Sequence, residues 1–128
     1  MLGKNSKIVI LDDDHSIAEL AAEILSDLGF ENINVYSSID SFTENMRLAI
    51  ADLFFLDVNL DKADGLTLLS WIKAKQPSSK VVMFSGDTRE HLIKEAYQLG
   101  AEGFLSKYCL DKNIRNLLNK WNVNYPLT

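Results

Sequence analysis

The chain has 128 residues, with 13 basic and 18 acidic side chains that give a formal net charge of −5. This length suits one compact domain, and 47% hydrophobic residues are enough to build a core without disulfides. No apolar run approaches the ~20 residues that span a bilayer, and no basic stripe predicts direct nucleic-acid binding. One cysteine and the absence of an apolar leader fit a cytoplasmic protein.

The first half of the chain predicts two strands, each followed by a helix. The run KIVIL (7–11) is short, apolar and β-branched, which indicates a buried strand. Apolar residues then recur at helical spacing over 17–28, and Gly29 follows as a C-terminal cap. A second strand is predicted at 33–36 and a second helix at 37–50.

The second half continues the alternation. Strands and helices are predicted in turn for residues 53–56, 65–77, 80–85, 89–100, 103–106 and 111–121. Pro77 and Gly100 end two of these helices, and Asp111 is placed as the N-cap of the last one. Five strand–helix pairs indicate an α/β fold, a doubly wound parallel sheet with helices on both faces.

The predicted domain covers residues 1–121, and residues 122–128 form a short C-terminal tail or the start of a linker. No internal repeat, low-complexity segment or second domain is found in the sequence.

Acidic, hydroxyl and amine groups follow four of the five predicted strands. Ligands of open parallel sheets bind at the carboxyl ends of the strands, so these groups are expected to meet at one edge. They are Asp12, Asp13, Asp14, Asp57, Ser85 and Lys107. Clustered carboxylates without histidine or thiolate favour Mg²⁺ or Mn²⁺. One carboxylate could form an aspartyl phosphate, while Lys107 and Ser85 contact the phosphoryl oxygens.

Four stretches at the strand ends together resemble a known family. They are VILDDD, LFFLDVNLDKADG, VVMFSGD and GAEGFLSK. In this order they resemble the CheY-like receiver domain of two-component response regulators. The resemblance implies a flavodoxin-like (βα)5 fold with a five-stranded sheet in the order 2-1-3-4-5. It also implies a phosphoacceptor that assists its own phosphorylation and dephosphorylation and is not an enzyme in the ordinary sense.

Carried over by position, the resemblance makes Asp57 the phosphoacceptor. Asp12, Asp13 and Asp57 would bind Mg²⁺ or Mn²⁺, together with the backbone carbonyl of Asn59. Ser85 and Lys107 would bind the phosphoryl group.

Further positions match the switch of the family and the groups beside the phosphoryl site. Ser85 and Phe104 would be the switch residues, and Asn59 and Asp87 would tune the lifetime of the phosphoryl group. Asp64 and Gly65 match the turn into the third helix.

The resemblance also implies partners. The phosphodonor would be a histidine kinase or phosphotransfer protein, and the output would be an unknown partner or an effector domain. A homodimer could form through the face of the fourth helix, fifth strand and fifth helix. Lys107 is followed by Tyr108, where many receivers have proline, so we predict a trans Lys107–Tyr108 bond.

Three other interpretations remain open from the sequence. The stretch LDDDHS also fits a haloacid-dehalogenase-like phosphatase with Asp12 as nucleophile. The chain could also be a receiver-like binding module that never takes phosphate. Single residues have structural explanations as well: Asp14 is interpreted as a helix cap, Ser85 could begin an SGD turn, and Cys109 is interpreted as a small packing residue.

Overall fold

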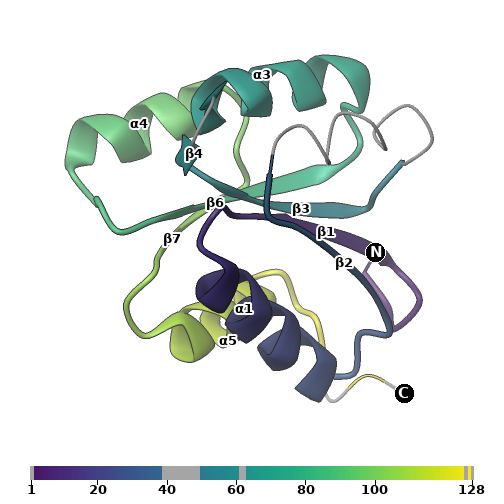
Figure 1. The fold of residues 1–128 in the computed structure, drawn as a ribbon. Helices are drawn as coiled ribbons and strands as arrows, with labels where there is room; N and C mark the ends of the chain where they lie inside the picture. Colours follow the sequence, from purple (N-terminus) through teal and green to yellow (C-terminus); the bar gives the residue numbers. More distant parts are fainter. Residues whose placement is uncertain (1, 39–49, 61–62, 126, 128) are drawn as a thin grey trace.

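A computed structural model describes the chain except residues 1, 39–49, 61–62, 126 and 128 (Figure 1). Five parallel strands form one sheet in the order β2-β1-β3-β6-β7. They are β1 (Lys7–Leu11), β2 (Asn32–Tyr36), β3 (Leu53–Asp57), β6 (Lys80–Ser85) and β7 (Gly103–Ser106). Counted along these five strands, this is the order 2-1-3-4-5, so the predicted sheet is confirmed.

Helices cover both faces of the sheet, as predicted for a doubly wound fold. They are α1 (His15–Asp27), α3 (Gly65–Lys75), α4 (Glu90–Gln98) and α5 (Leu110–Lys120). Helices α1 and α5 lie on one face and α3 and α4 on the other (Figure 1). The helix predicted at 37–50 falls almost entirely outside the described residues.

The alternation of side chains along β1 explains its continuous apolar run. Ile8 and Ile10 pack in the core beneath α1 and α5, whereas Val9 and Leu11 pack beneath α3 and α4. A strand covered on both faces has no polar side, so all four residues of β1 after Lys7 are apolar. All five residues of β3 are buried for the same reason.

A short antiparallel hairpin was not predicted. Strands β4 (Asn59–Leu60) and β5 (Ala63–Asp64) pair with each other directly after β3. Two residues are too few to produce a periodic sequence signal, so only the folded chain reveals this element.

The N-cap predicted for α1 is confirmed, whereas the one predicted for α5 is wrong. Asp14 is the N-cap of α1, where its carboxylate accepts the N–H groups of Ser16 and Ile17. The prediction that Asp111 caps α5 is wrong, because the helix begins at Leu110 after Cys109, which has the left-handed φ of 55°. Asp111 instead forms an ion pair with Arg115 one turn along α5. Such i, i+4 pairs also stabilise a helix, so the residue type alone did not distinguish the two roles.

Residues after α5 pack against the domain. Val123 is buried in the core beneath α1 and α5, and the Leu127 N–H donates to the Leu28 carbonyl at 2.9 Å. Gly29 has φ +108°, and a Cβ there would lie 2.7 Å from the Leu127 nitrogen. Gly29 therefore provides both the left-handed end of α1 and room for the tail.

None of the described helices has the length and apolar character needed to cross a bilayer.

Candidate phosphoacceptor site

Asp12, Asp57, Ser85 and Lys107 meet at the carboxyl edge of the sheet. Asp12 directly follows β1, Asp57 ends β3, Ser85 ends β6 and Lys107 directly follows β7. The parallel register aligns these strand ends, so side chains far apart in sequence become neighbours.

Three carboxylates form the acidic part of the site. Asp12, Asp13 and Asp57 each bring one oxygen within 4.8 Å of the others, with Asp12 and Asp57 buried and Asp13 exposed. Asp12 Oδ1 accepts the Asp14 N–H at 2.9 Å, and Asp57 Oδ1 accepts the Asn59 N–H at 3.1 Å. These turns hold one oxygen of each buried carboxylate.

The other oxygens of the two buried carboxylates face Lys107. Its Nζ lies 3.0 Å from Asp12 Oδ2 and 3.1 Å from Asp57 Oδ2. The Lys107 backbone is held as well, because its N–H donates to the Ser85 carbonyl at 2.9 Å. Burial alone would lower the pKa of Lys107, but its interactions with the Asp12 and Asp57 carboxylates outweigh this and raise it. The side chain is therefore a stable cation.

One cation does not fully compensate two buried carboxylates. Burial and the charge of Asp12 raise the pKa of Asp57 from 3.8 to about 7, although the Asn59 N–H and Lys107 oppose the shift. At neutral pH the site therefore favours any further positive charge beside Asp57.

The donor set fits a hard divalent cation. Asp12 Oδ2 is fully buried, and among the described residues no group gives it a well-directed hydrogen bond, although Lys107 lies within ion-pair distance. Carboxylate oxygens, with no nitrogen or sulfur donor beside them, suit Mg²⁺ and Mn²⁺. Asn59, at the start of β4, is exposed and two residues from Asp57.

Gly65 holds the end of β3 in position. Its N–H donates to the Val58 carbonyl at 2.9 Å, and a Cβ at this position would lie 2.1 Å from the Asp57 carbonyl oxygen. Asp64 caps α3 by accepting the Leu66 N–H at 3.0 Å. Asp64 and Gly65, which match the turn before the third helix, thus stabilise the backbone beside Asp57.

Ser85 takes part in the turn that follows β6. The residue is fully buried, and its Oγ accepts the Asp87 N–H at 2.9 Å. The interpretation of SGD as a turn is therefore confirmed, and this does not conflict with a place in the site.

Arg89 is a residue that the sequence reasoning missed. Its side chain binds both oxygens of the Asp87 carboxylate, at 2.6–3.0 Å. This pairing holds the pKa of Asp87 below its usual value. An aspartate and an arginine two positions apart in one loop were the only available signal.

Phe104 is half-buried in the core cluster beneath α3 and α4. It lies on β7 and pairs with Met83 of β6, two residues before Ser85 on the same strand. Two aromatic side chains on the neighbouring surface are exposed, Tyr97 of α4 and Tyr108 after β7.

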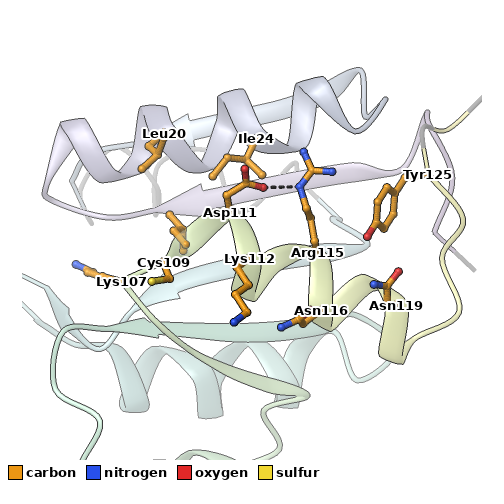
Figure 2. Close-up of a pocket in the computed structure, with 11 residues that line it drawn as sticks. Leu20, Ile24, Lys107, Cys109, Asp111, Lys112, Arg115, Asn116, Asn119 and Tyr125 are labelled. Carbon is orange, nitrogen blue, oxygen red and sulfur yellow. Dashed lines mark hydrogen bonds and ion pairs between the residues drawn. The ribbon is translucent and has the colours of Figure 1, made fainter.

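A hollow of about 780 Å³ lies between α1 and α5, and Lys107 is one of its lining residues (Figure 2). Leu20 and Ile24 of α1 line one side, and Arg115 and Tyr125 lie toward the other end. Cys109 lines it as an exposed residue, so its interpretation as a packing residue is wrong. The left-handed backbone at Cys109 turns the side chain out of the core.

Comparison with known proteins identifies the family. Residues 8–119 match the family described as the response regulator receiver domain. The chain belongs to this family.

Relatives and solved structures agree with this receiver domain. Chemotaxis protein CheY-3 of Vibrio cholerae is 30% identical over 124 residues, which cover 94% of each chain. Fimbriae Z protein of Salmonella typhimurium is 34% identical over 101 residues, 77% of this chain but only 48% of its own length. The chain thus spans about half the length of that relative. The Salmonella typhimurium RcsB response regulator shares the fold, with a TM-score of 0.82 at 20% identity over 93% of this chain and 60% of its own.

Proposed function

We propose that Asp57 accepts a phosphoryl group from a phosphohistidine and that this modification switches the domain. The observation that carries the proposal is the position of Lys107 Nζ, 3.0 Å from Asp12 and 3.1 Å from Asp57 at the carboxyl edge of the sheet. A nucleophilic carboxylate, further acids and a fixed cation are the groups that phosphoryl transfer to an aspartate needs.

In this proposal a carboxylate oxygen of Asp57 attacks the phosphorus. The P–O bond forms as the P–N bond to the donor imidazole breaks, and the imidazole leaves as the neutral ring after taking a proton. Lys107 stabilises the charge on the equatorial oxygens, which is greatest in the transition state. Asp12, Asp13, Asp57 and the Asn59 carbonyl would hold Mg²⁺ or Mn²⁺, which when bound neutralises phosphoryl charge.

Ser85 and Phe104 are the proposed switch residues. The Ser85 hydroxyl would bond a phosphoryl oxygen, and the movement of Ser85 would open space for the half-buried Phe104 ring. Repacking of Phe104 would change the surface of α4, β7 and α5, a population shift between two arrangements. Asn59 and Asp87 flank the site and would set phosphoryl lifetime by controlling the approach of water.

The partners follow from this chemistry. We assign the phosphodonor to a cytoplasmic histidine kinase or phosphotransfer protein, and the output to a partner or effector domain that reads the α4-β7-α5 surface. A homodimer through this surface is one form that the output could take. We place the structural boundary of the receiver domain beyond residue 121, because Val123 and Leu127 contact its core and α1.

The test is intact-mass analysis after incubation with acetyl phosphate and Mg²⁺. Wild-type protein is expected to gain one phosphoryl group, and Asp57→Asn protein and an EDTA sample are expected to gain none. Asp111→Asn is the matched control, since Asp111 is an exposed carboxylate outside the acidic cluster.

Two outcomes would contradict the proposal. Labelling that survives Asp57→Asn but is lost in Asp12→Asn would indicate the phosphatase-like chemistry. No labelling of the wild type, also with a histidine-phosphorylated donor protein, would indicate a module that works without phosphate.

A further inference from the structure

The loop between β6 and α4 is held by a chain of hydrogen bonds that begins at Ser85. The Asp87 N–H donates to Ser85 Oγ at 2.9 Å, and the Arg89 N–H donates to Asp87 Oδ1 at 3.1 Å. Two successive side-chain turns therefore fix the backbone from the end of β6 to the residue before α4.

The Arg89 guanidinium closes this chain. Its Nε lies 3.0 Å from Asp87 Oδ1 and 2.9 Å from Oδ2, and Nη2 lies 2.6 Å from Oδ2. A planar guanidinium that contacts both carboxylate oxygens fixes orientation as well as distance. Asp87 is therefore held from both its side chain and its backbone.

The contact is not needed to begin α4. Arg89 is the N-cap residue of that helix, yet its side chain makes no capping hydrogen bond and points its charge to Asp87. Arg89 is also remote from the core, with a side chain that is 69% exposed. Its contact with Asp87 therefore acts on the loop and not on the packing of the helix.

We infer that Arg89 is a positioning residue of the switch, which holds Ser85 in the resting arrangement by clamping Asp87. The inference rests on the proposed function, because it assumes that Ser85 moves toward a phosphoryl group on Asp57. Such a movement must break the bond between Ser85 Oγ and the Asp87 N–H or shift the Asp87 backbone. The Arg89 clamp opposes the shift of Asp87, so the movement of Ser85 costs this hydrogen bond.

The direction of the effect distinguishes this role from simple electrostatics. Removing a cation near an anion site weakens anion binding, whereas releasing a clamp on the resting state strengthens it. An exposed ion pair contributes little free energy, so we expect the affinity for a phosphoryl mimic to change by about two- to fivefold.

The experiment titrates the protein with beryllium trifluoride in saturating Mg²⁺, as a mimic of the phosphoryl group, and follows amide signals by NMR. Arg89→Gln is expected to lower the half-saturating concentration by about two- to fivefold. Arg89→Lys, which keeps the charge but not the two-pronged contact, is expected to shift it in the same direction. Arg115→Gln is the matched control, because it breaks another exposed Arg–Asp pair and changes the charge equally.

A second measurement reads the clamp without any phosphoryl group. Hydrogen exchange of the Asp87 amide is expected to be faster in Arg89→Gln than in the wild type, while core amides of β3 keep their rates. Unchanged exchange at Asp87, or a half-saturating concentration that is unchanged or higher, would overturn the inference. If the wild type fails to bind the mimic, the proposed function is wrong. The Asp87 exchange rate alone then shows whether Arg89 restrains Asp87.

Discussion

The ammonium of Lys107 lies 3.1 Å from the Asp57 carboxylate and 3.0 Å from that of Asp12. A single lysine thus faces two buried acids and compensates their charges only in part. The two carboxylates repel each other, and this repulsion lowers the stability of the domain. The same carboxylates would hold a metal ion, and Lys107 would hold a phosphoryl group.

Replacing Lys107 by Met should destabilise the domain because two buried carboxylates lose their cation. We expect the free energy of unfolding without divalent metal to fall by about 1–3 kcal/mol at about pH 8. Urea denaturation in EDTA measures this. Lys112→Met, which removes an exposed lysine from α5, is the control and should change little. Equal stability of the two variants would show that Lys107 does not compensate the acids.

The raised pKa of Asp57 predicts a pH-dependent stability. The folded protein keeps this proton up to about pH 7, whereas the unfolded chain loses it near 3.8. Between these values the folded state binds more protons, so the free energy of unfolding falls as pH rises. Asp57→Asn should remove this slope and raise stability at about pH 8 by on the order of 2 kcal/mol in EDTA.

Urea titrations across this pH range test the prediction, with Asp111→Asn as control. If the free energy of unfolding still falls with rising pH in Asp57→Asn, another group is responsible for the titration. Added Mg²⁺ should stabilise the wild type most at the upper end of the range, because the deprotonated carboxylate is the form that binds a cation.

Gly65→Ala should disturb the phosphoacceptor without touching its side chain. A Cβ at this position would lie 2.1 Å from the Asp57 carbonyl oxygen, so the end of β3 must shift. We expect a loss of stability of about 1–3 kcal/mol and slower labelling by acetyl phosphate. Gly3→Ala is the control, since a Cβ at Gly3 meets no atom within 4 Å. Normal labelling of Gly65→Ala would mean that the strand end tolerates the shift.

Asp13 and Asp14 should behave differently although they are adjacent. Asp13→Asn should raise the Mg²⁺ concentration needed for half-maximal labelling by about tenfold or more, because a proposed metal ligand loses its charge. Asp14→Ala should leave this concentration unchanged but cost about 1 kcal/mol of stability, because α1 loses its N-cap. Labelling at a series of Mg²⁺ concentrations, with urea denaturation alongside, separates the two. A reversed pattern would exchange the two assignments.

Removal of residues 122–128 should destabilise the domain. Val123 is buried beneath α1 and α5, and burial of such a side chain contributes about 1.5–3 kcal/mol. Thermal denaturation of the shortened chain should therefore show a lower midpoint. Asn124→Ala, which changes an exposed tail residue, should match the wild type. An unchanged midpoint after truncation would place these residues in a linker.

The sequence predicted most of the fold because its signals are local. The continuous apolar run at 53–56 indicates a strand that is buried on both faces. The helical spacing of apolar residues over 17–28 indicates a helix that is buried on one face. The grouping of Asp12, Asp57, Ser85 and Lys107 followed from parallel topology, which brings strand ends to one edge. The strand order followed from the resemblance to receiver domains.

Other features depended on contacts that no segment encodes by itself. The hairpin of β4 and β5 is too short for a periodic signal, and Cys109 rather than Asp111 precedes α5 because the chain turns there with a left-handed residue. The tail beyond 121 is polar in sequence, yet Val123 and Leu127 pack against apolar side chains of the core beneath α1 and α5. This apolar surface forms only when the two helices lie side by side.

By itself, the sequence determined which residues form the five-stranded sheet, which faces of α3 and α5 are buried and which charged groups reach the carboxyl edge. The tertiary structure alone decided that Lys107 contacts both buried acids, that Gly65 touches the Asp57 backbone, and that Arg89 clamps Asp87 beside Ser85. The physical reason is that periodicity and turn chemistry act within a few residues. Distances between side chains on different strands and loops are set by the packing of the whole domain.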